Sequence, residues 1–136
     1  MAVASSSVLF GALHLLNPAA TVWGAIAIAV QAGLLTAGAF VLTRKLWLPI
    51  GIHLGWNFAL SGLFGATVSG SDGSVGGLLD GAPHGAAIIS GGDFGPEASI
   101  FSVLVCGVAG FLMLRKAHRQ GRFVKAAPRQ PKISNS

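Results

Sequence analysis

Two polar side chains, those of His53 and Asn57, lie in the otherwise apolar stretch PIGIHLGWNF at positions 49–58. Residues four positions apart share one face of a helix, so a helix here would direct the imidazole and the amide the same way. An imidazole can ligate a metal ion or carry a proton, and an amide can donate to an oxyanion. The pair is therefore a candidate catalytic site. The structural alternative is a neutral histidine that donates to a backbone carbonyl across a helix interface. On roughly the opposite face, Gly51 and Gly55 form a small-xxx-small pair, which predicts close approach of another helix.

A second histidine, His14, lies in the apolar stretch FGALH, with Phe10 one helical turn before it. Two imidazoles from different helices would supply two of the three protein ligands that a catalytic zinc ion usually takes. A third ligand or a carboxylate base should complete such a site. The chain has four carboxylates, which all lie in a glycine-rich segment or at its edge: Asp72, Asp80, Asp93 and Glu97. By spacing alone, the metal site is incomplete.

The composition indicates an integral membrane protein. Hydrophobic residues make up 52% of the 136 residues and charged residues only 10%, and no charged side chain occurs between Met1 and Arg44. A helix rises about 1.5 Å per residue and the hydrocarbon core is roughly 30 Å thick, so this stretch is long enough for two crossings. The single cysteine, Cys106, excludes an internal disulfide and is interpreted as a small packing residue.

The net charge of +5 reflects membrane topology rather than binding to nucleic acid. All nine Lys and Arg residues fall at Arg44–Lys45 or within 115–132, and no aromatic platform accompanies them. Basic residues flanking membrane helices favour the cytoplasmic side. We therefore expect the lipid bilayer as a partner, no nucleic-acid partner, and a C-terminal tail in the cytoplasm.

The fold class predicted is all-α, a polytopic transmembrane bundle of about four hydrophobic helices. The helices are expected over 4–16, 19–43, 46–64 and 97–114, with a break at Asn17–Pro18 because proline disfavours helical geometry in the residue before it. A transmembrane domain would cover 1–115, and a basic, disordered tail 116–136. The first 20 residues could also be read as a signal peptide, but they lack its basic N-terminal region.

Residues 65–95 are expected to be an irregular loop outside the membrane. This segment holds ten of the chain's 20 glycines, which lose much entropy on ordering. Glu97 follows it and is predicted to stabilise the start of the helix over 97–114, since a carboxylate there faces the positive end of the helix dipole. A role for Glu97 as a metal ligand is the alternative.

The order of the two motifs, Phe10-x-x-x-His14 and then His53-x-x-x-Asn57, resembles the CPBP family of intramembrane proteases, with LWLPIGIHLGWNF around the second motif. This family comprises CAAX proteases and bacteriocin-processing, or Abi, proteins. Its pattern starts with a Glu-Glu-x-x-x-Arg helix, and no Glu-Glu pair occurs in this sequence. We therefore expect an N-terminally incomplete or non-catalytic relative.

The resemblance implies a role for each matching residue. His14 and His53 would hold a divalent metal ion, with zinc the first candidate, or polarise the attacking water. Asn57 would donate to the oxyanion, Phe10 would shape the substrate pocket, and a glutamate of the absent motif would be the general base. The activity implied is intramembrane metalloendopeptidase hydrolysis of a peptide or protein substrate, within a multi-pass membrane protein (plasma membrane in a prokaryote).

Two other functions stay open. A non-catalytic membrane protein could keep the scaffold for binding or immunity. A haem protein with His14 and His53 as axial ligands would explain the histidines but has no use for Asn57 or Phe10. One geometric question also stays open, because His14 should lie near the outer end of its helix and His53 about two turns inside the cytoplasmic end of its own. They would meet only if the break at Asn17–Pro18 lies within the membrane or the helix over 19–43 is strongly tilted.

Overall fold

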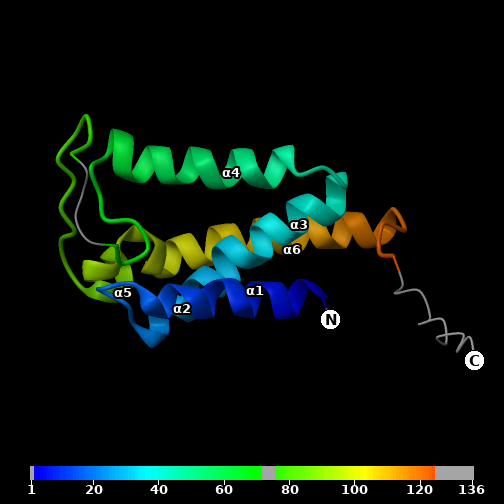
Figure 1. The fold of residues 1–136 in the computed structure, drawn as a ribbon, viewed down its shortest axis with the longest axis horizontal. Coiled ribbons are helices and arrows are strands. Elements are labelled where there is room, and N and C mark those ends of the chain that lie inside the picture. The colour runs from blue at the N-terminus through cyan, green and yellow to red at the C-terminus, as the bar shows by residue number, and fades with distance from the viewer. Residues whose placement is uncertain (1, 72–75, 125–136) are drawn as a thin grey trace, which may run out of the picture.

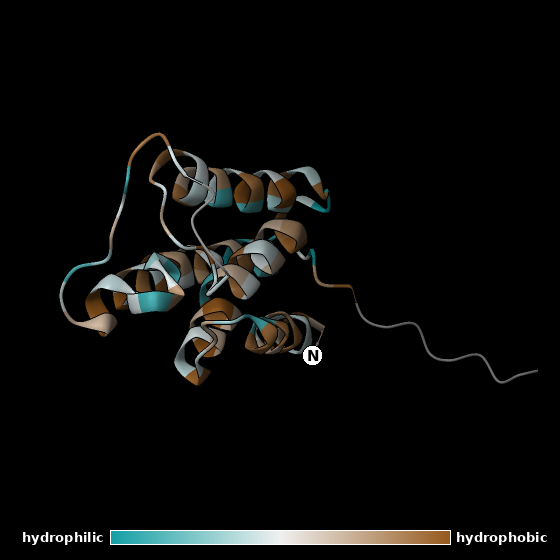
Figure 2. Cartoon of the chain, turned by 60° about the vertical axis from the view of Figure 1, so that its left-hand side comes forward, coloured by the Kyte–Doolittle hydropathy of each residue, from teal (hydrophilic) through white to brown (hydrophobic). Residues whose placement is uncertain are grey.

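The structure is a computed structural model that describes residues 2–71 and 76–124. Within these residues it is all-helical and contains no strand, which confirms the predicted fold class. Figure 1 shows α1, the helix formed by α2 and α3, α4 and α6 running along the long axis of the bundle. Two of its helices, Val22–Thr43 and Ile100–Arg119, are long and apolar enough to cross a membrane. Figure 2 shows hydrophobic residues along much of the helical ribbon, and many large hydrophobic side chains are exposed, as is expected of lipid-facing helices.

The elements follow one another in a simple order, and their bounds close to the site agree with the predicted ranges. The elements are α1 (Ala2–Leu13), η1 (His14–Leu16), α2 (Val22–Ile28), η2 (Ala29–Gly33), α3 (Leu34–Thr43), α4 (Trp47–Asn57), η3 (Phe58–Leu63), α5 (Ala87–Ser90), η4 (Gly92–Phe94), η5 (Pro96–Ala98) and α6 (Ile100–Arg119). The segments η2 and η3 are π-helical turns that continue the α-helices before them. Turns of this kind are rare and often mark functional sites.

Local chemistry explains where these helices begin and end. The Thr21 hydroxyl caps α2 by accepting from the backbone N–H of Gly24 at 2.9 Å, and the Ser99 hydroxyl caps α6 by accepting from Phe101 at 3.2 Å. Side-chain oxygens at this position satisfy backbone donors that the first turn leaves unpaired. Arg44 ends α3 in a left-handed conformation with φ of 57°.

Small residues set the close packing between helices. A Cβ added at Gly110 of α6 would lie 2.9 Å from the backbone of Leu34, and one added at Gly38 of α3 would lie 2.9 Å from the carbonyl oxygen of Gly110. The backbones of α3 and α6 therefore touch, as small residues allow in membrane bundles. A Cβ at Gly33 would similarly lie 2.8 Å from Ser7 of α1.

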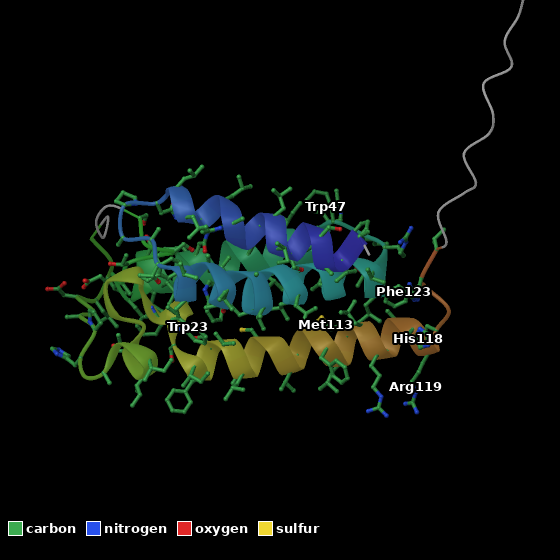
Figure 3. All side chains as sticks on the ribbon, turned by 90° about the horizontal axis from the view of Figure 1, so that it is seen from below. Trp23, Trp47, Met113, His118, Arg119 and Phe123 are labelled. Atoms are coloured by element: carbon green, nitrogen blue, oxygen red, sulfur yellow. The ribbon has the colours of Figure 1, made fainter. Side chains whose placement is uncertain are left out.

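The basic residues of the described chain lie at one end of the bundle. Figure 1 shows the turn between α3 and α4, which carries Arg44–Lys45, at the same end as the C-terminal end of α6. Figure 3 shows His118 and Arg119 at this end, with Trp47 toward it and Trp23 toward the opposite end. The predicted arrangement of the basic residues is thus reproduced, and the glycine-rich segment lies at the other end.

The sequence-based predictions of the last helix and of the loop before it were partly wrong. The last helix starts at Ile100, three residues later than predicted, and continues to Arg119, so residues 116–119 are helix and not tail. The region 65–95 is not without elements, because α5 and η4 form inside it. The remainder of the tail beyond Val124, and Asp72 in the loop, lie outside the described residues.

A further prediction, close packing of another helix against Gly51 and Gly55 of α4, also fails within the described residues. No atom of the described residues lies within 4 Å of a Cβ built at either glycine. This face of α4 is therefore open within the described part of the chain. No residue of α4 is fully buried, so α4 is held less tightly than the other long helices.

Candidate active site

The aromatic ring of Phe10 brings the two histidines of the candidate site together. Its centroid lies 4.9 Å from that of the His14 imidazole and 5.9 Å from that of His53, and it meets the second ring edge to face. Such ring pairs are favourable at these separations. The geometric question is therefore resolved, because a residue of α1 contacts α4 at the level of His53.

Hydrogen bonds orient each histidine. His14 Nδ1 lies 2.7 Å from the carbonyl oxygen of Phe10, one turn before it, and donates to it. Its Nε2 is then the free acceptor of the neutral ring. The Asn57 side-chain nitrogen lies 3.2 Å from His53 Nε2 and donates to it, which leaves the ring proton of neutral His53 on Nδ1. The four residues Phe10, His14, His53 and Asn57 thus form one connected group.

The scaffold fixes this group from two sides. Phe10 packs against a buried cluster of Ile28, Phe94 and Ala98, so its ring cannot swing away from the histidines without opening the core. Asn57 is the last residue of α4, and the π-helical segment Phe58–Leu63 begins directly after it. The Asn57 Oδ1 atom is buried and has no hydrogen-bond partner. An unpaired buried acceptor is costly, which is typical of a position that binds a ligand or substrate.

The histidine pair alone does not complete a metal site. Across residues 2–71 and 76–124, no three His, Cys, Asp or Glu side chains come together in an arrangement that would hold a metal ion. Two imidazoles fall short of the three protein ligands usual for catalytic zinc. In addition, Nε2 of His53 is engaged by Asn57. A metal ion here would require a further ligand and a rearranged His53.

Glu97 does not cap the last helix, contrary to the prediction. Only 2% of it is exposed, and it lies in the turn Pro96–Ala98 before Ser99, which is the actual cap. Its Oε1 accepts from the Trp56 indole at 3.0 Å, and its Oε2 accepts from the backbone N–H and the hydroxyl of Ser69 at 2.5 and 2.6 Å. Both carboxylate oxygens are therefore occupied, and the alternative role as a metal ligand finds no support in the described contacts.

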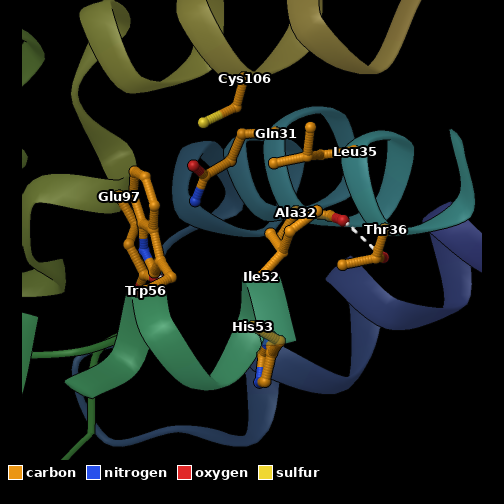
Figure 4. A pocket seen from close by; sticks show the side chains of 9 residues that line it. All are labelled: Gln31, Ala32, Leu35, Thr36, Ile52, His53, Trp56, Glu97 and Cys106. Atoms are coloured by element: carbon orange, nitrogen blue, oxygen red, sulfur yellow. Dashed lines mark hydrogen bonds between the residues drawn. The ribbon is translucent and has the colours of Figure 1, made fainter. Parts of the chain in front are cut away.

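A small cavity of about 20 Å³ lies between η2, α3, α4 and α6 (Figure 4). His53, Trp56 and Glu97 form part of its wall, and Gln31 points into it (Figure 4). Gln31 is 1% exposed and its side-chain nitrogen has no partner among the described residues. A volume of this size holds about one water molecule, provided that polar groups face it. The cavity therefore offers room for a single water beside His53.

The remaining histidines and the haem alternative are less favoured. His84 is exposed in the loop, and His118 packs edge to face on Phe123 at 5.9 Å. The ring of Phe10 contacts both His14 and His53. It thus occupies space that a haem between two axial imidazoles would need.

Sequence reasoning missed three polar residues near the site, Gln31, Trp56 and Ser69, and assigned Glu97 to the start of the last helix instead of to a buried position. One indication was available, because Asn17 follows His14 by three residues and Trp56 follows His53 by three. These spacings place a hydrogen-bonding side chain one turn after each histidine. The partners of these side chains, Ser69 for Asn17 and Glu97 for Trp56, depend on tertiary structure and could not be predicted from the spacing.

The fold is that of a helical membrane bundle, and its candidate site groups His14, His53 and Asn57 around Phe10. Residues 1–59 match the family model described as type II CAAX prenyl endopeptidase Rce1-like. This match includes every residue of the candidate site and confirms, over that part of the chain, the resemblance to the CPBP family of CAAX proteases. Neither the curated proteins nor the solved structures gave a significant match.

Proposed function

We propose that this chain carries the histidine site of a CAAX-protease-like intramembrane endopeptidase. The observation that supports this most is the contact of one ring, Phe10, with both His14 and His53, while Asn57 is hydrogen-bonded to His53. The match of residues 1–59 to the CAAX endopeptidase model agrees with it. The substrate class proposed is a peptide or protein that reaches the site from the bilayer.

The orientation of each side chain suggests its role in peptide hydrolysis. The free Nε2 of His14 would accept a hydrogen bond from the attacking water and polarise it. The water oxygen would bond to the carbonyl carbon, and the second N–H of the Asn57 amide would donate to the resulting oxyanion. A carboxylate base from outside the described residues would take the proton that the attacking water loses, and would pass it to the leaving amine as the carbon–nitrogen bond breaks. Phe10 would form one wall of the pocket for the substrate.

A divalent metal ion remains part of the proposal, with zinc the first candidate. His14 and His53 would give two ligands, and a third would have to come from outside the described residues. No step of the hydrolysis described here depends on this ion. If it binds, His53 must exchange its hydrogen bond from Asn57 for the metal or use its other nitrogen.

We further propose that residues 1–136 by themselves hydrolyse peptides slowly or not at all. A general base typically contributes a factor of about 10²–10⁴ in rate. Glu97 is the one buried carboxylate among the described residues, and both its oxygens already accept hydrogen bonds. The same observation favours a second candidate function, a non-catalytic membrane protein that uses the scaffold for binding or immunity.

For localisation, we propose a multi-pass integral membrane protein with its C-terminal tail in the cytoplasm. Support comes from the two apolar helices of spanning length and from the basic residues gathered at one end. The experiment that tests the function is cleavage of a fluorogenic membrane peptide by the purified chain together with an added fragment that contributes a carboxylate-bearing helix, because the parent is expected to be active only with a general base. Cleavage that is lost in both His14→Ala and Asn57→Ala supports the enzyme, and cleavage that persists in both excludes this site as its source.

A further inference from the structure

Glu97 connects two parts of the chain that carry the site. Its carboxylate accepts from the indole of Trp56 on α4 at 3.0 Å and from the hydroxyl of Ser69, in the following loop, at 2.6 Å. Only 2% of the Glu97 residue is exposed. A buried carboxylate needs such donors, because leaving it unpaired in a low-dielectric interior is strongly unfavourable. The charge of Glu97 therefore ties Trp56 and Ser69 firmly to one point.

The next contact continues from Ser69 to the end of the first helix. The side-chain nitrogen of Asn17 donates to the Ser69 carbonyl oxygen at 2.6 Å. Ser69 has a φ of 54°, a left-handed conformation that is uncommon for a serine. In this conformation its N–H and hydroxyl point to Glu97 while its carbonyl accepts from Asn17. We call the connected series Trp56, Glu97, Ser69 and Asn17 the polar strap.

Both ends of the polar strap lie one turn after a histidine. Trp56 follows His53 by three residues on α4, and Asn17 follows His14 by three residues at the end of η1. α4 packs along α3 but has no fully buried residue, and a Cβ built at Gly51 or Gly55 meets no described atom within 4 Å. The hydrogen bonds of the strap therefore add a polar link between the end of α4 and the end of η1, beside the packing on α3 and the contact of His53 with Phe10.

We propose that Glu97 is a positioning residue, which holds α4 and the end of α1 in the relative arrangement that brings His53 to Phe10 and His14. The inference goes beyond the proposed function, on which it rests for its catalytic consequence only. Glu97 touches no reacting group in this role. It sets the distance between the two histidine-bearing segments through Trp56 on one side and Ser69 and Asn17 on the other.

A distance measurement tests this without requiring activity. Spin labels would be placed on cysteines at Leu16, which is 83% exposed beside His14, and at Leu54, which is 68% exposed beside His53, in a Cys106→Ala background. Pulsed electron–electron double resonance in nanodiscs then reports the distribution of distances between the labels at positions 16 and 54. The parent chain should give a single narrow distribution.

Glu97→Gln should shift or broaden this distribution. Glutamine has a single acceptor oxygen, so it cannot accept at both Trp56 and Ser69. The matched control is Asp93→Asn, which removes the same charge from an exposed position four residues earlier and should leave the distribution unchanged. Trp56→Phe keeps an aromatic side chain and the hydrogen bonds from Ser69 to the Glu97 carboxylate, but removes the hydrogen bond that Trp56 of α4 donates. It should therefore shift or broaden the distance distribution as Glu97→Gln does, and it gives a second test if Glu97→Gln fails to fold.

The double variant gives the sharpest result. If Glu97 acts through Trp56, adding Trp56→Phe to Glu97→Gln should change the distribution no further. If both folded single variants keep the narrow distribution of the parent chain, the positioning role is excluded. Where the protein hydrolyses peptides, both variants should lower kcat more than they change KM. An altered distance in the variants, with no hydrolysis by the parent even when a carboxylate-bearing fragment is added, would support the strap and contradict the proposed function.

Discussion

Asn57 donates a hydrogen bond of 3.2 Å to Nε2 of His53, one turn earlier on the same helix, while its own Oδ1 stays buried and unpaired. The Asn57 amide therefore has an unpaired hydrogen-bond acceptor close to the place where Phe10 contacts His14 and His53. In a purely structural pair, the amide would be expected to satisfy both of its ends. The relationship favours a site that is completed by another group.

Close packing between α3 and α6 should be sensitive to a single methyl group. Gly110→Ala would place a Cβ 2.9 Å from the backbone of Leu34, and rigid backbone on both sides leaves little room to adjust. Overpacking of this kind typically costs about 1–3 kcal/mol. We expect a lower melting temperature in detergent for this variant.

The matched control for Gly110→Ala is Gly51→Ala. A Cβ at Gly51 of α4 meets no described atom within 4 Å, so this variant should keep or slightly raise the melting temperature, since alanine favours helix. Equal melting temperatures for the two variants would contradict the assigned α3–α6 contact.

Topology follows from the two basic clusters at one end of the bundle. A cysteine at exposed Ser71, in a Cys106→Ala background, should be labelled by an impermeant reagent from outside intact cells. A cysteine at Lys45 should be labelled only after the cells are opened. The reverse pattern at the two positions would overturn the assignment.

The helices could be predicted well from the sequence, and their contacts could not. Uncharged stretches and the Asn17–Pro18 break located α1 and the α2–α3 helix, because length and charge dominate in a bilayer. The ordered motifs also named four residues that the structure brings into contact, although their catalytic role stays a prediction. By contrast, Glu97 was predicted to stabilise a helix start because it follows Pro96, whereas the structure buries it in the turn before the actual cap, Ser99.

The role of Glu97 depends on partners that are 28 and 41 residues away along the chain. No local pattern encodes such a pairing, and the left-handed φ of Ser69 that permits it belongs to a non-glycine residue. The prediction that another helix packs against Gly51 and Gly55 was wrong for a different reason. A small-residue motif permits close approach but does not supply the helix that approaches.

Metal binding should depend on the two site histidines and not on the others. If His14 and His53 contribute ligands, His53→Ala should abolish stoichiometric zinc binding by the purified protein, because it removes one of about three ligands. His84→Ala, at an exposed loop position, is the control and should bind zinc as the parent does. Zinc content by mass spectrometry after dialysis is the measurement. Equal loss in both variants, or none in either, would contradict a metal role for His53.

Residues 1–136 alone should show little proteolysis, since their described part offers no free carboxylate beside the histidines. The rate expected is about 10²–10⁴ below that of a site with its general base. Adding a purified fragment that contributes a carboxylate-bearing helix should raise it. Fast, His53-dependent cleavage by the chain alone would show that a base is already present within it.

The central claim is that His53 and Asn57 act on a substrate rather than hold the bundle together. Loss of one side-chain hydrogen bond in a bilayer costs roughly 0.6 kcal/mol on average, so Asn57→Ala should melt near the parent temperature. Removing an oxyanion donor typically lowers turnover by about 10²–10³. Ser61→Ala, one turn later on the same helix, is the matched control and should change neither quantity.

The most direct measurement is turnover of a membrane peptide beside thermal stability, for Asn57→Ala and the parent under conditions where the parent is active. We predict a fall in turnover of about 10²–10³ with stability preserved. If the variant unfolds, or stays folded with parental turnover, the His53–Asn57 pair is a structural contact within α4 and the site does not hydrolyse peptides as proposed.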